Sequence, residues 1–578
     1  MIEKNRLLKF ILKMKNDYLK GTEVLIHSLL KEGVDTIFGY PGGTIMPLYD
    51  ELYSYKSKLN HILVRHEQGA VHAAEGYARA SGKTGVCIAT AGPGATNLVT
   101  GVADALMDST PIVCITAQVN ADKLGTNFFQ EADTISITIP VTKWSYQITY
   151  ADEIEEIISK AFYIARTGRP GPVLISFTRN AQVGSTNNYN KEYSPYNFMC
   201  FIREKLSDST VKLAASMINN SQRPLIIAGQ GVILSGAEEE LCKLAERGNI
   251  PLASTLMGLS AIPTSHQLFA GNVGMHGNFA PNKMTQKSDL IIAIGMRFSD
   301  RVTGDTSRYA TEAKIIHIDI DKAEFNKTIK STLQIHGDAK EVLSAIMPYI
   351  QYSEKRDWLE FKKECIREEM VLVIDKVINP KSERAISMAK AVETIATQSK
   401  GDAIIVTDVG QHQMFCARYS RFNKSRSMIT SGGLGTMGFG LPAAIGAKFG
   451  AKERVVIAVL GDGGFQMTMQ ELGTVMQSEA DIKIVVLNNS FLGMVRQWQE
   501  LFFNGRYSST KMENPDFIKI AQSYNISANR VDKPALLQDS VREMLSHKGS
   551  FLLEIVVERE ENVYPMIPSG ASLDEVLY

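Results

Sequence analysis

Residues 459–494 read VLGDGGFQMTMQELGTVMQSEADIKIVVLNNSFLGM, and this stretch decides the fold of its region. An apolar run ends in Gly-Asp-Gly, a stretch with helical character follows at 468–480, and a second apolar run ends in two asparagines. Two β-branched runs joined by a helix predict a right-handed parallel βαβ unit. Asp462 and Asn489 then lie at the carboxyl ends of neighbouring strands, where open α/β sheets bind ligands.

The residue types at this edge indicate the kind of ligand. One carboxylate oxygen and one amide oxygen suit Mg²⁺, which prefers oxygen ligands and shares its coordination sphere with phosphate and water. Gly461, Gly463 and Gly464 allow the backbone to approach a phosphate at a helix N-terminus. The pattern is not GxGxxG, so a dinucleotide site is weakly supported. Two ordinary turns remain an alternative for GDG alone, and much less so for GDG and NN together.

A related unit stands early in the chain. Residues 85–119, GVCIATAGPGATNLVTGVADALMDSTPIVCITAQV, also read as strand, glycine turn, helix and strand. Pro93 stands where the later unit has Asp462, and the second strand ends without the asparagine pair. Two like modules, only one with ligand-type residues, suggest a division of labour over one elongated ligand. Two independent units of a common kind are the alternative.

Three blocks of alternating strand and helix patterns predict an α/β protein with three doubly wound parallel-sheet domains. We place them at 18–183, 198–350 and 380–558, followed by a tail at 559–578 without periodicity. The Asn- and Tyr-rich stretch 184–197 reads as a linker. A charged segment at 353–370 leads to Asn-Pro-Lys-Ser at 379–382 and the third block.

Composition excludes several classes of protein. Lys+Arg and Asp+Glu are equal at 62 each, so charge gives no argument for nucleic acid or an anionic membrane. No apolar run is long enough to span a bilayer. The six cysteines are scattered without a CxxC pair, which suggests a reducing compartment. Residues 1–17 are basic and lack a cleavage site, so we expect a frayed helix there rather than a targeting signal.

The GDG and NN motifs resemble the signature of the thiamine diphosphate (ThDP) enzymes. The resemblance implies that Asp462 and Asn489 ligate Mg²⁺, with the main-chain oxygen of Phe491 as third ligand. The Mg²⁺ would hold the cofactor's diphosphate, so the opening stretch positions the cofactor and makes no bonds itself.

Glu67 is the candidate for activating such a cofactor. A carboxyl group that hydrogen-bonds the cofactor's pyrimidine ring favours loss of the thiazolium proton, and it should lie in an apolar setting. Residues 64–82, VRHEQGAVHAAEGYARASG, place Glu67 between a strand and a helix whose inward positions are Ala and Gly, small enough to admit a flat ring. A solvated helix-start residue is the alternative, but Glu67 matches the family's catalytic Glu. We expect His66 and His72 to be capping or packing residues.

From about Tyr18 to the end, the chain is similar to acetohydroxyacid synthase (acetolactate synthase) catalytic subunits. These are transferases that decarboxylate pyruvate and condense the two-carbon unit with a second pyruvate or 2-oxobutyrate, in branched-chain amino-acid biosynthesis. The matching stretches are FGYPGGTIMPLYD, RHEQGAVHAAEGYARASG, TAGPGATNLVTG, FFQEAD, GMRFSDRVTG, GGLGTMGFGLPAAIGA, LGMVRQW and VYPMIPSGAS.

The resemblance implies roles for further residues. Residues 18–183 would be the pyrimidine-binding domain, 380–558 the diphosphate- and Mg²⁺-binding domain, and 559–578 a cover for the active site. The diphosphate would contact Gln411 and His412 beside Gly461 and Gly463, with Met437 buttressing the bent cofactor. The substrate pocket would be formed by Phe129, Gln130, Arg297, Met494 and Trp498, with Gln130 also catalytic.

Residues 198–350 would be a FAD-binding domain, although no motif here identifies flavin unaided. The implied flavin contacts are Arg169, Gly229, Gly231, His276, Arg297, Asp319 and Asp338. Arg297 can stack on a ring and still pair with a substrate carboxylate. A surface ion pair is its alternative, given the neighbouring Asp300 and Arg301.

Two departures from the family pattern weaken single assignments. The family often has Pro-Lys-Asp where this chain has Thr178-Arg179-Asn180, so a substrate role for Arg179 has little support. Ser-Asp-Arg at 299–301 replaces the more usual Asp-Asp-Arg. This suggests that Asp300 and Arg301 are the more important members.

The resemblance also implies partners: pyruvate, 2-oxobutyrate and a second copy of the chain, in a homodimer or homotetramer with active sites between subunits. A small regulatory subunit is left open. Composition leans towards a plastid-encoded protein of the chloroplast stroma, with a bacterial cytoplasm as the alternative. Rival functions are a pyruvate oxidase, a glyoxylate carboligase, against which Glu67 argues, and a non-catalytic subunit, against which Glu67, Asp462 and Asn489 argue.

Overall fold

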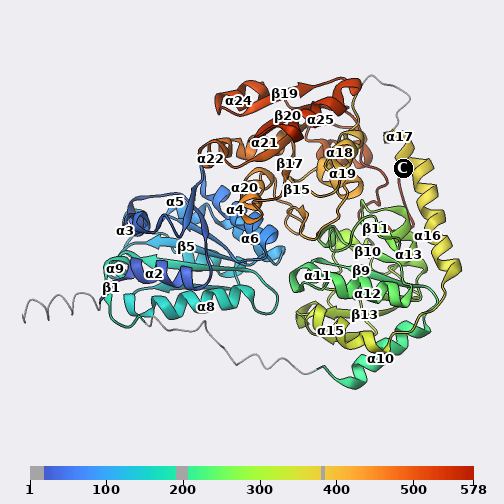
Figure 1. The fold of residues 1–578 in the computed structure, drawn as a ribbon, viewed down its shortest axis with the longest axis horizontal. Helices are drawn as coiled ribbons and strands as arrows, with labels where there is room; N and C mark the ends of the chain where they lie inside the picture. The colour runs from blue at the N-terminus through green and yellow to red at the C-terminus, as the bar shows by residue number, and fades with distance from the viewer. Residues whose placement is uncertain (1–17, 190–205, 379–384) are drawn as a thin grey trace, which may run out of the picture.

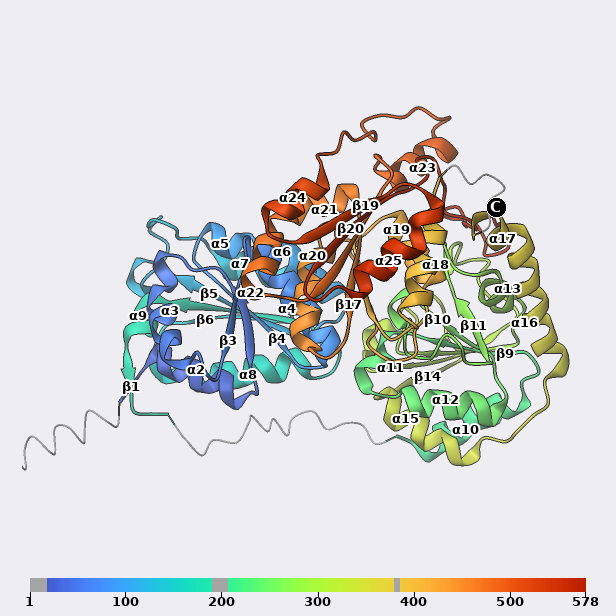
Figure 2. The same cartoon turned by 45° about the horizontal axis from the view of Figure 1, so that its top comes forward.

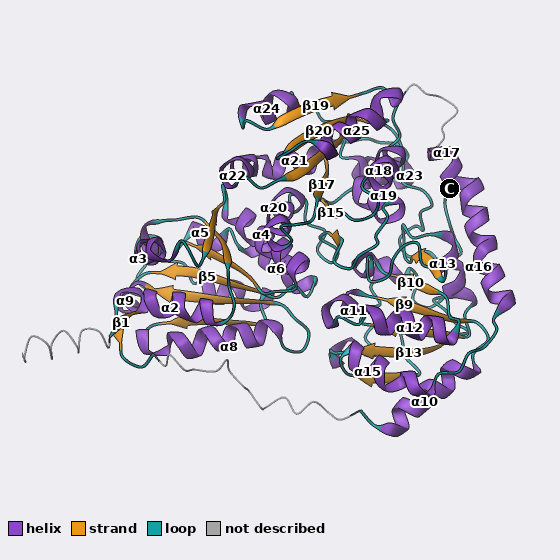
Figure 3. Cartoon of the chain, viewed as in Figure 1, coloured by secondary structure: helices purple, strands orange, loops and turns teal. Residues whose placement is uncertain are grey.

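The computed structural model describes residues 18–189, 206–378 and 385–578. It forms three six-stranded sheets, each with helices on both faces (Figures 1 and 3). The predicted helix at 1–17, most of the linker at 184–197, and residues 379–382 lie outside the described residues, as do the first residues of two predicted domains. In the described part of the linker, β8 (Ser185–Thr186) pairs antiparallel with β1 (Leu19–Lys20).

The N-terminal sheet is parallel throughout, in the order β3-β2-β4-β5-β7-β6. Its central strands are fully buried, as expected for a parallel sheet covered on both faces. The strands are β2 (Thr36–Gly39), β3 (Asn60–Leu63), β4 (Gly85–Ala89), β5 (Ile112–Gln118), β6 (Trp144–Ile148) and β7 (Pro172–Thr178). The helices are α2 (Gly21–Lys31), α3 (Met46–Leu52), α4 (Glu67–Ser81), α5 (Pro93–Thr96), α6 (Val99–Met107), α7 (Thr134–Thr138), α8 (Ile154–Arg166) and α9 (Arg179–Val183).

The middle sheet is also parallel, in the order β11-β10-β9-β12-β13-β14. Its strands are β9 (Pro224–Ala228), β10 (Leu252–Ser254), β11 (Phe269–Asn272), β12 (Leu290–Ile294), β13 (Lys314–Asp319) and β14 (Leu333–His336). Its helices are α10 (Asp208–Asn220), α11 (Gln230–Ser235), α12 (Glu238–Gly248), α13 (Phe279–Lys287), α14 (Asp300–Thr303), α15 (Ala339–Ile346), α16 (Arg356–Glu369) and α17 (Asp375–Ile378). The charged segment predicted at 353–370 is mostly α16, which runs along the outer edge of this domain (Figure 1).

The C-terminal sheet has the order β16-β15-β17-β18-β20-β19, again parallel. Its strands are β15 (Ile404–Thr407), β16 (Met428–Ile429), β17 (Val456–Gly461), β18 (Ile482–Asn488), β19 (Ser527–Val531) and β20 (Phe551–Val556). Its helices are α18 (Met388–Gln398), α19 (Gln411–Tyr419), α20 (Gly440–Gly450), α21 (Asp462–Thr468), α22 (Leu472–Ser478), α23 (Gly493–Phe502), α24 (Phe517–Ser523) and α25 (Leu537–Ser546). The predicted fold class of three parallel-sheet domains is therefore confirmed.

The opening stretch forms the predicted βαβ unit, with β17 and β18 paired in parallel. The connecting helix differs from the prediction in its start and its continuity. It begins at Asp462, and it is divided into α21 and α22 by a 3₁₀ turn at Met469–Glu471. Thr468 has φ −136°, which ends the first piece. Asp462 therefore stands inside the first helical turn.

Helices α4 and α20 join the N- and C-terminal domains (Figures 1 and 2). The sequence predicts that the small residues of α4 admit a flat ring, but in the structure they admit α20. A Cβ at Gly76 would lie 1.9 Å from the carbonyl oxygen of Ala443, and one at Gly446 would lie 1.8 Å from that of Ala73. The two backbones therefore approach as closely as glycine allows.

Gly446→Ala is expected to destabilise the protein by about 1–3 kcal/mol, because the added methyl must push the two helices apart. The thermal unfolding midpoint measured by calorimetry should fall. Gly43→Ala is the matched control, since a Cβ there meets nothing within 4 Å. Equal midpoints for the two variants would contradict this view of the α4–α20 contact.

The tail at 559–578 packs on the middle domain and on α23. The N–H of Ile567 donates to the carbonyl of Met275 at 2.8 Å, and the N–H of Asp305 donates to that of Ala571 at 2.9 Å. The N–H of Val563 donates to Gln497 Oε1 at 2.8 Å. No helix among the described residues is long and apolar enough to cross a membrane, and the five described cysteines are free.

Candidate active site and cofactor cavity

Asp462 and the asparagine pair meet at one edge of the C-terminal sheet. Asp462 follows β17 directly, and a tight turn after β18, with Ser490 at φ 58°, returns the chain past it. Asp462 Oδ2 accepts a hydrogen bond from Asn514 Nδ2 at 2.6 Å. Burial raises the pKa of Asp462 to about 6, opposed by the hydrogen bonds from Asn514 and from the N–H groups of Gly463 and Ser490.

Asn514 is a member of this group that sequence reasoning missed. Its amide nitrogen donates to Asp462 Oδ2 at 2.6 Å and to Asn488 Oδ1 at 2.9 Å, so it ties the two motifs together. Asn514 lies in an irregular segment after α23, and no sequence pattern marks it. Only the folded chain shows that it orients the carboxylate.

Asn489 and Phe491 complete an oxygen-rich set. Asn489 is buried; its Oδ1 accepts the N–H of Phe491 at 3.2 Å, and its Nδ2 donates to Gln411 Oε1 at 3.3 Å. A carboxylate, an amide oxygen and a nearby main-chain oxygen are hard donors of the kind that Mg²⁺ prefers. The residues present therefore fit a Mg²⁺ ion.

His412 lies beside the GDG turn, where the diphosphate is expected. A Cβ at Gly461 would be 3.0 Å from the His412 ring, so glycine is needed for the imidazole to lie there. Burial lowers the pKa of His412 to about 4, so the ring is neutral at neutral pH. Its Nε2 is buried without a hydrogen-bond partner among the described residues. A buried polar atom in this condition fits contact with a bound polar group.

Met437 reaches the same turn from the loop before α20. A Cβ at Gly463 would be 3.7 Å from Met437 Cε and 2.8 Å from Leu492 Cδ2. The structure thus brings Gln411, His412, Met437, Gly461, Gly463, Asp462, Asn489 and Phe491 into one group within the C-terminal domain.

Glu67 begins α4 in the N-terminal domain. His66 caps this helix, because its Nδ1 accepts the N–H of Gln68 at 3.1 Å. Glu67 Oε2 accepts from Asn97 Nδ2 at 3.0 Å, and Oε1 lies next to Gly94. Asn97 is a second residue that sequence reasoning did not single out, although it stands in the quoted TAGPGATNLVTG stretch.

Phe129 and Gln130 belong to the N-terminal group. Gln130 has φ 64°, and its carbonyl lies close to Gly92. Gly92 stands two residues before Gly94, which lies next to Glu67 Oε1. The side chain of Phe129 is 82% exposed. Arg179 is exposed at the start of α9, and its guanidinium donates to the carbonyl of Gly43 at 3.5 Å. Glu67 and the diphosphate group thus lie in different domains.

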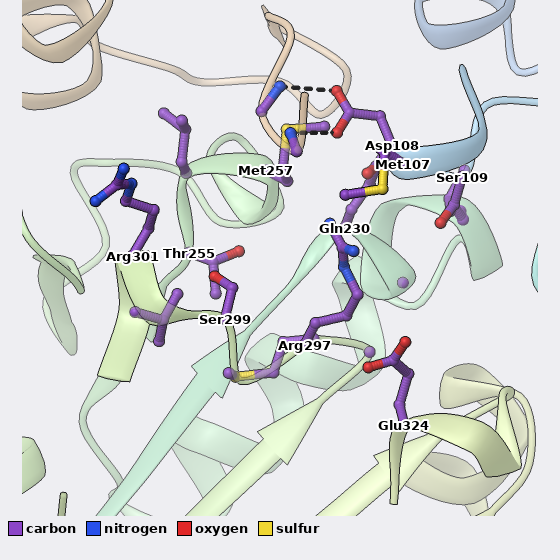
Figure 4. A pocket seen from close by; sticks show the side chains of 18 of the residues that line it. Met107, Asp108, Ser109, Gln230, Thr255, Met257, Arg297, Ser299, Arg301 and Glu324 are labelled. Carbon is purple, nitrogen blue, oxygen red and sulfur yellow. Dashed lines mark hydrogen bonds between the residues drawn. The ribbon is translucent and has the colours of Figure 1, made fainter. Parts of the chain in front are cut away.

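A cavity of about 1190 Å³ lies where the three domains meet (Figure 4). Of the seven predicted flavin residues, six line it: Arg169, Gly231, His276, Arg297, Asp319 and Asp338. The seventh, Gly229, packs behind the wall, where its Cβ would meet the carbonyl of Gly295 at 2.1 Å. The volume suits a large cofactor.

Fixed polar groups line the cavity. Arg169 donates to Ser109 Oγ at 2.8 Å and to Glu324 Oε1 at 3.0 Å. Burial lowers the pKa of His276 to about 3, and its Nδ1 is buried without a partner among the described residues. Burial raises the pKa of Asp319, at the end of β13, to about 6. Asp338 also caps α15 by accepting the N–H of Lys340 at 3.0 Å.

Arg297 points into this cavity, between Gln230 and Glu324 in Figure 4. The surface ion pair considered for it is formed by its neighbours instead: Arg301 Nη1 lies 3.7 Å from Asp300 Oδ2, and both side chains are exposed. Arg301 also lies 6.0 Å from the ring centroid of Trp498. Trp498 and Met494 line the same cavity, so three of the five predicted substrate residues share it with the flavin residues, whereas Phe129 and Gln130 do not line it.

Comparison with known proteins identifies the class. Residues 19–137 match the thiamine pyrophosphate enzyme, N-terminal TPP binding domain. Residues 211–346 match the central domain of these enzymes, and residues 408–555 match their C-terminal TPP binding domain. The fold described above is therefore that of a thiamine pyrophosphate enzyme.

Relatives that match nearly the whole chain show which family of thiamine pyrophosphate enzymes it belongs to. The chain is 44% identical to a probable acetolactate synthase large subunit of Methanocaldococcus jannaschii, over 97% of this chain and 95% of the relative. It is 41% identical to the acetolactate synthase large subunit of Lactococcus lactis, over 96% of each. It is 41% identical to the acetolactate synthase isozyme 2 large subunit of Escherichia coli, over 97% and 99%. The chain belongs to the acetolactate synthase large subunits.

Proposed function

We propose that the chain joins two molecules of pyruvate into 2-acetolactate with release of one CO₂, and accepts 2-oxobutyrate in place of the second pyruvate. The observation that carries this is the single cavity that Arg297, Met494 and Trp498 share with Gly433 and Gly435 of the loop before Met437. A guanidinium and an apolar wall beside the cofactor loop suit a small 2-oxo acid, whose carboxylate and alkyl group need different surroundings.

Each group of residues has a distinct task in this proposal. Bound ThDP supplies the electron sink that makes decarboxylation feasible. Glu67, held by Asn97, would hydrogen-bond the pyrimidine ring of bound ThDP and so favour loss of the thiazolium proton. Asp462, Asn489 and the Phe491 carbonyl would hold Mg²⁺, and Gln411 and His412 would contact the diphosphate. The apolar walls exclude water while the acceptor arrives.

FAD is proposed for the part of the cavity lined by Arg169, His276, Arg297 and Asp319, with a structural role. The support is the buried Nδ1 of His276 without a partner among the described residues, together with a volume suited to a large ligand. Arg297 would lie between the flavin end and the substrate end.

Partners and location follow from the same reasoning. A homodimer or homotetramer is proposed because Phe128 and Phe129 beside the Glu67 group are 54% and 82% exposed. A second copy can cover them and supply its diphosphate group. A small regulatory subunit remains a prediction. A plastid location also remains a prediction, to which the bacterial and archaeal relatives give no support. Residues 559–578 are proposed to cover the active site. Their hydrogen bond to Gln497, next to Trp498, would hold them there.

Trp498→Leu is expected to lower the preference for 2-oxobutyrate over pyruvate by about tenfold, because one pocket contact of this size contributes about 1–3 kcal/mol. The ratio of the two products from mixed substrates measures it. Phe502→Leu is the control, since Phe502 lies on the same helix with its ring centroid 5.1 Å from that of Trp498 and does not line the cavity. An unchanged ratio in Trp498→Leu would remove Trp498 from substrate choice.

Cofactor analysis with single omissions tests the proposed function. Purified protein, stripped and resupplied with ThDP, Mg²⁺ and FAD, should form acetolactate from pyruvate and lose this activity when ThDP or Mg²⁺ is withheld. Oxygen uptake or flavin bleaching on adding pyruvate would instead identify a pyruvate oxidase. Binding of cofactors without turnover would identify a non-catalytic subunit.

A further inference from the structure

A group of buried ionisable side chains lies behind the loop Ser431–Met437, and the proposed reaction does not use this group. His72 and Glu75 of α4 and Asp104 of α6 have no exposed surface. One ligand-type atom from each lies within 4.8 Å of the other two. Asp108, at the end of α6, is 2% exposed, and its Oδ2 lies 3.7 Å from Arg79 Nη1.

Two carboxylate oxygens in this group have no hydrogen-bond donor. Glu75 Oε1 lies 3.0 Å from His72 Nδ1, and Asp104 Oδ1 accepts hydrogen bonds from the hydroxyls of Ser431 and Thr436. Glu75 Oε2 and Asp104 Oδ2 are buried without a partner among the described residues, and one oxygen of each carboxyl group lies within 4.8 Å of the other. Two ionised carboxylates in this arrangement repel each other, whereas a protonated carboxyl supplies the missing donor.

We propose that Glu75 and Asp104 share one proton at neutral pH, and that the pair positions the loop Ser431–Met437 of the C-terminal domain. Glu75 carries the proton on Oε2 and donates it to Asp104 Oδ2, while Glu75 Oε1 accepts the N–H of His72 Nδ1. The Asp104 carboxylate then receives three donors: Glu75, Ser431 and Thr436.

The contacts of this loop show what the pair controls. Asp104 holds the hydroxyl of Thr436, the residue before Met437, at 3.1 Å. Asp108 accepts the N–H groups of Gly432 at 2.8 Å and Gly433 at 2.7 Å. Two carboxyl groups of the N-terminal domain therefore fix both ends of the loop that brings Met437 to the GDG turn. Glu75 acts through Asp104 and is a positioning residue.

The charged surroundings give the pH dependence its sign. The ionisable groups that act on the pair are His72 and Arg79 from α4, Asp108 directly after α6, and Cys114 from β5. Asp408 after β15 acts on His72, and Arg297 of the middle domain acts on Asp108. Burial raises the pKa of Glu75 and of Asp104. The Asp108 carboxyl group raises both further, and Glu75 also raises the pKa of Asp104. The folded chain holds the proton more tightly than the unfolded chain does. The contribution of this proton to the free energy of unfolding is therefore complete at low pH. It is lost as the pH rises through the raised pKa.

Infrared spectroscopy tests the shared proton without any need for turnover. The purified protein at neutral pH should show a protonated-carboxyl C=O stretch that shifts in D₂O and is absent in Glu75→Gln. Glu554→Gln is the matched control, because that buried carboxylate accepts donors on both oxygens, from Asn488 at 2.8 Å and Arg530 at 2.7 Å. The band should persist in this control. A band unchanged in Glu75→Gln, or one equivalent of metal bound at His72, Glu75 and Asp104, would overturn the proposal.

ThDP affinity tests the positioning role, which rests on the proposed function, whereas the infrared result does not. Glu75→Leu removes the donor and is expected to weaken ThDP binding by about tenfold. Glu75→Gln should restore it, because an amide N–H donates to Asp104 without titrating. A folded Glu75→Gln variant that binds ThDP as weakly as Glu75→Leu would overturn the role. Acetolactate activity absent in the wild type, with ThDP binding intact, would count against the proposed function alone.

Discussion

Glu67→Gln is expected to lower the rate of acetolactate formation by about 10²–10⁴-fold, the usual contribution of one acid–base group. The amide occupies the same volume and can still face Asn97, but it has no carboxyl group to stabilise the pyrimidine tautomer that removes the thiazolium proton. The rate constant kcat at saturating ThDP should fall, and proton exchange at the thiazolium, followed by NMR in D₂O, should slow to a similar extent.

A control separates this effect from a general disturbance of the domain. Glu155→Gln, which removes a carboxylate paired with Lys31 at 2.7 Å on the opposite side of the sheet, should leave the exchange rate within twofold of the wild type, by the usual size of surface effects at about 0.5 kcal/mol. If Glu67→Gln exchanges the thiazolium proton at the wild-type rate, Glu67 is not the activating group.

Loss of a residue that only orients a metal ligand typically weakens metal binding by about 10–100-fold. Asp462→Ala is expected to weaken Mg²⁺-dependent ThDP binding by more than that. Removing the carboxylate takes away the only anionic ligand that the protein is proposed to supply to the ion. Asn514→Ala, which removes the hydrogen bond at 2.6 Å that orients this carboxylate, should fall within that smaller range. Titration calorimetry with ThDP at fixed Mg²⁺ measures both variants.

The two variants should also differ in how far added Mg²⁺ restores ThDP binding. Asn514 acts through Asp462, so its loss should be partly offset by raising the Mg²⁺ concentration. Asp462→Ala should resist such rescue. Wild-type ThDP affinity in Asp462→Ala would show that the metal site lies elsewhere.

The local motifs predict that Asp462 and Asn489 lie together, because each motif stands at a strand end in a short stretch of sequence. Asp462 and Asn489 meet because β17 and β18 are adjacent and parallel, which the alternation of apolar runs already implies. The flavin and substrate residues came only from the family resemblance. The cavity that most of them line depends on how three domains pack, and periodicity within one domain carries no information on that packing.

The residues that sequence reasoning missed or assigned otherwise share one property: their roles are made by partners distant in the chain. Asn514 has a role only because a loop after α23 folds back onto the GDG turn. The small residues of α4 receive α20 rather than a ring, because Ala443 and Gly446 stand opposite them. His72 is the packing residue expected, with its ring centroid 5.3 Å from that of Phe439. Its buried neighbours Glu75 and Asp104 become visible only in three dimensions.

The most direct test of the central claim is the stoichiometry of the reaction with ¹³C-labelled pyruvate. The protein supplied with ThDP, Mg²⁺ and FAD should convert two pyruvates into one 2-acetolactate and one CO₂, followed together by NMR, with no oxygen consumed. Release of CO₂ with acetate or acetyl phosphate as the product, or with uptake of oxygen, would contradict the assignment as a carbon–carbon bond-forming transferase.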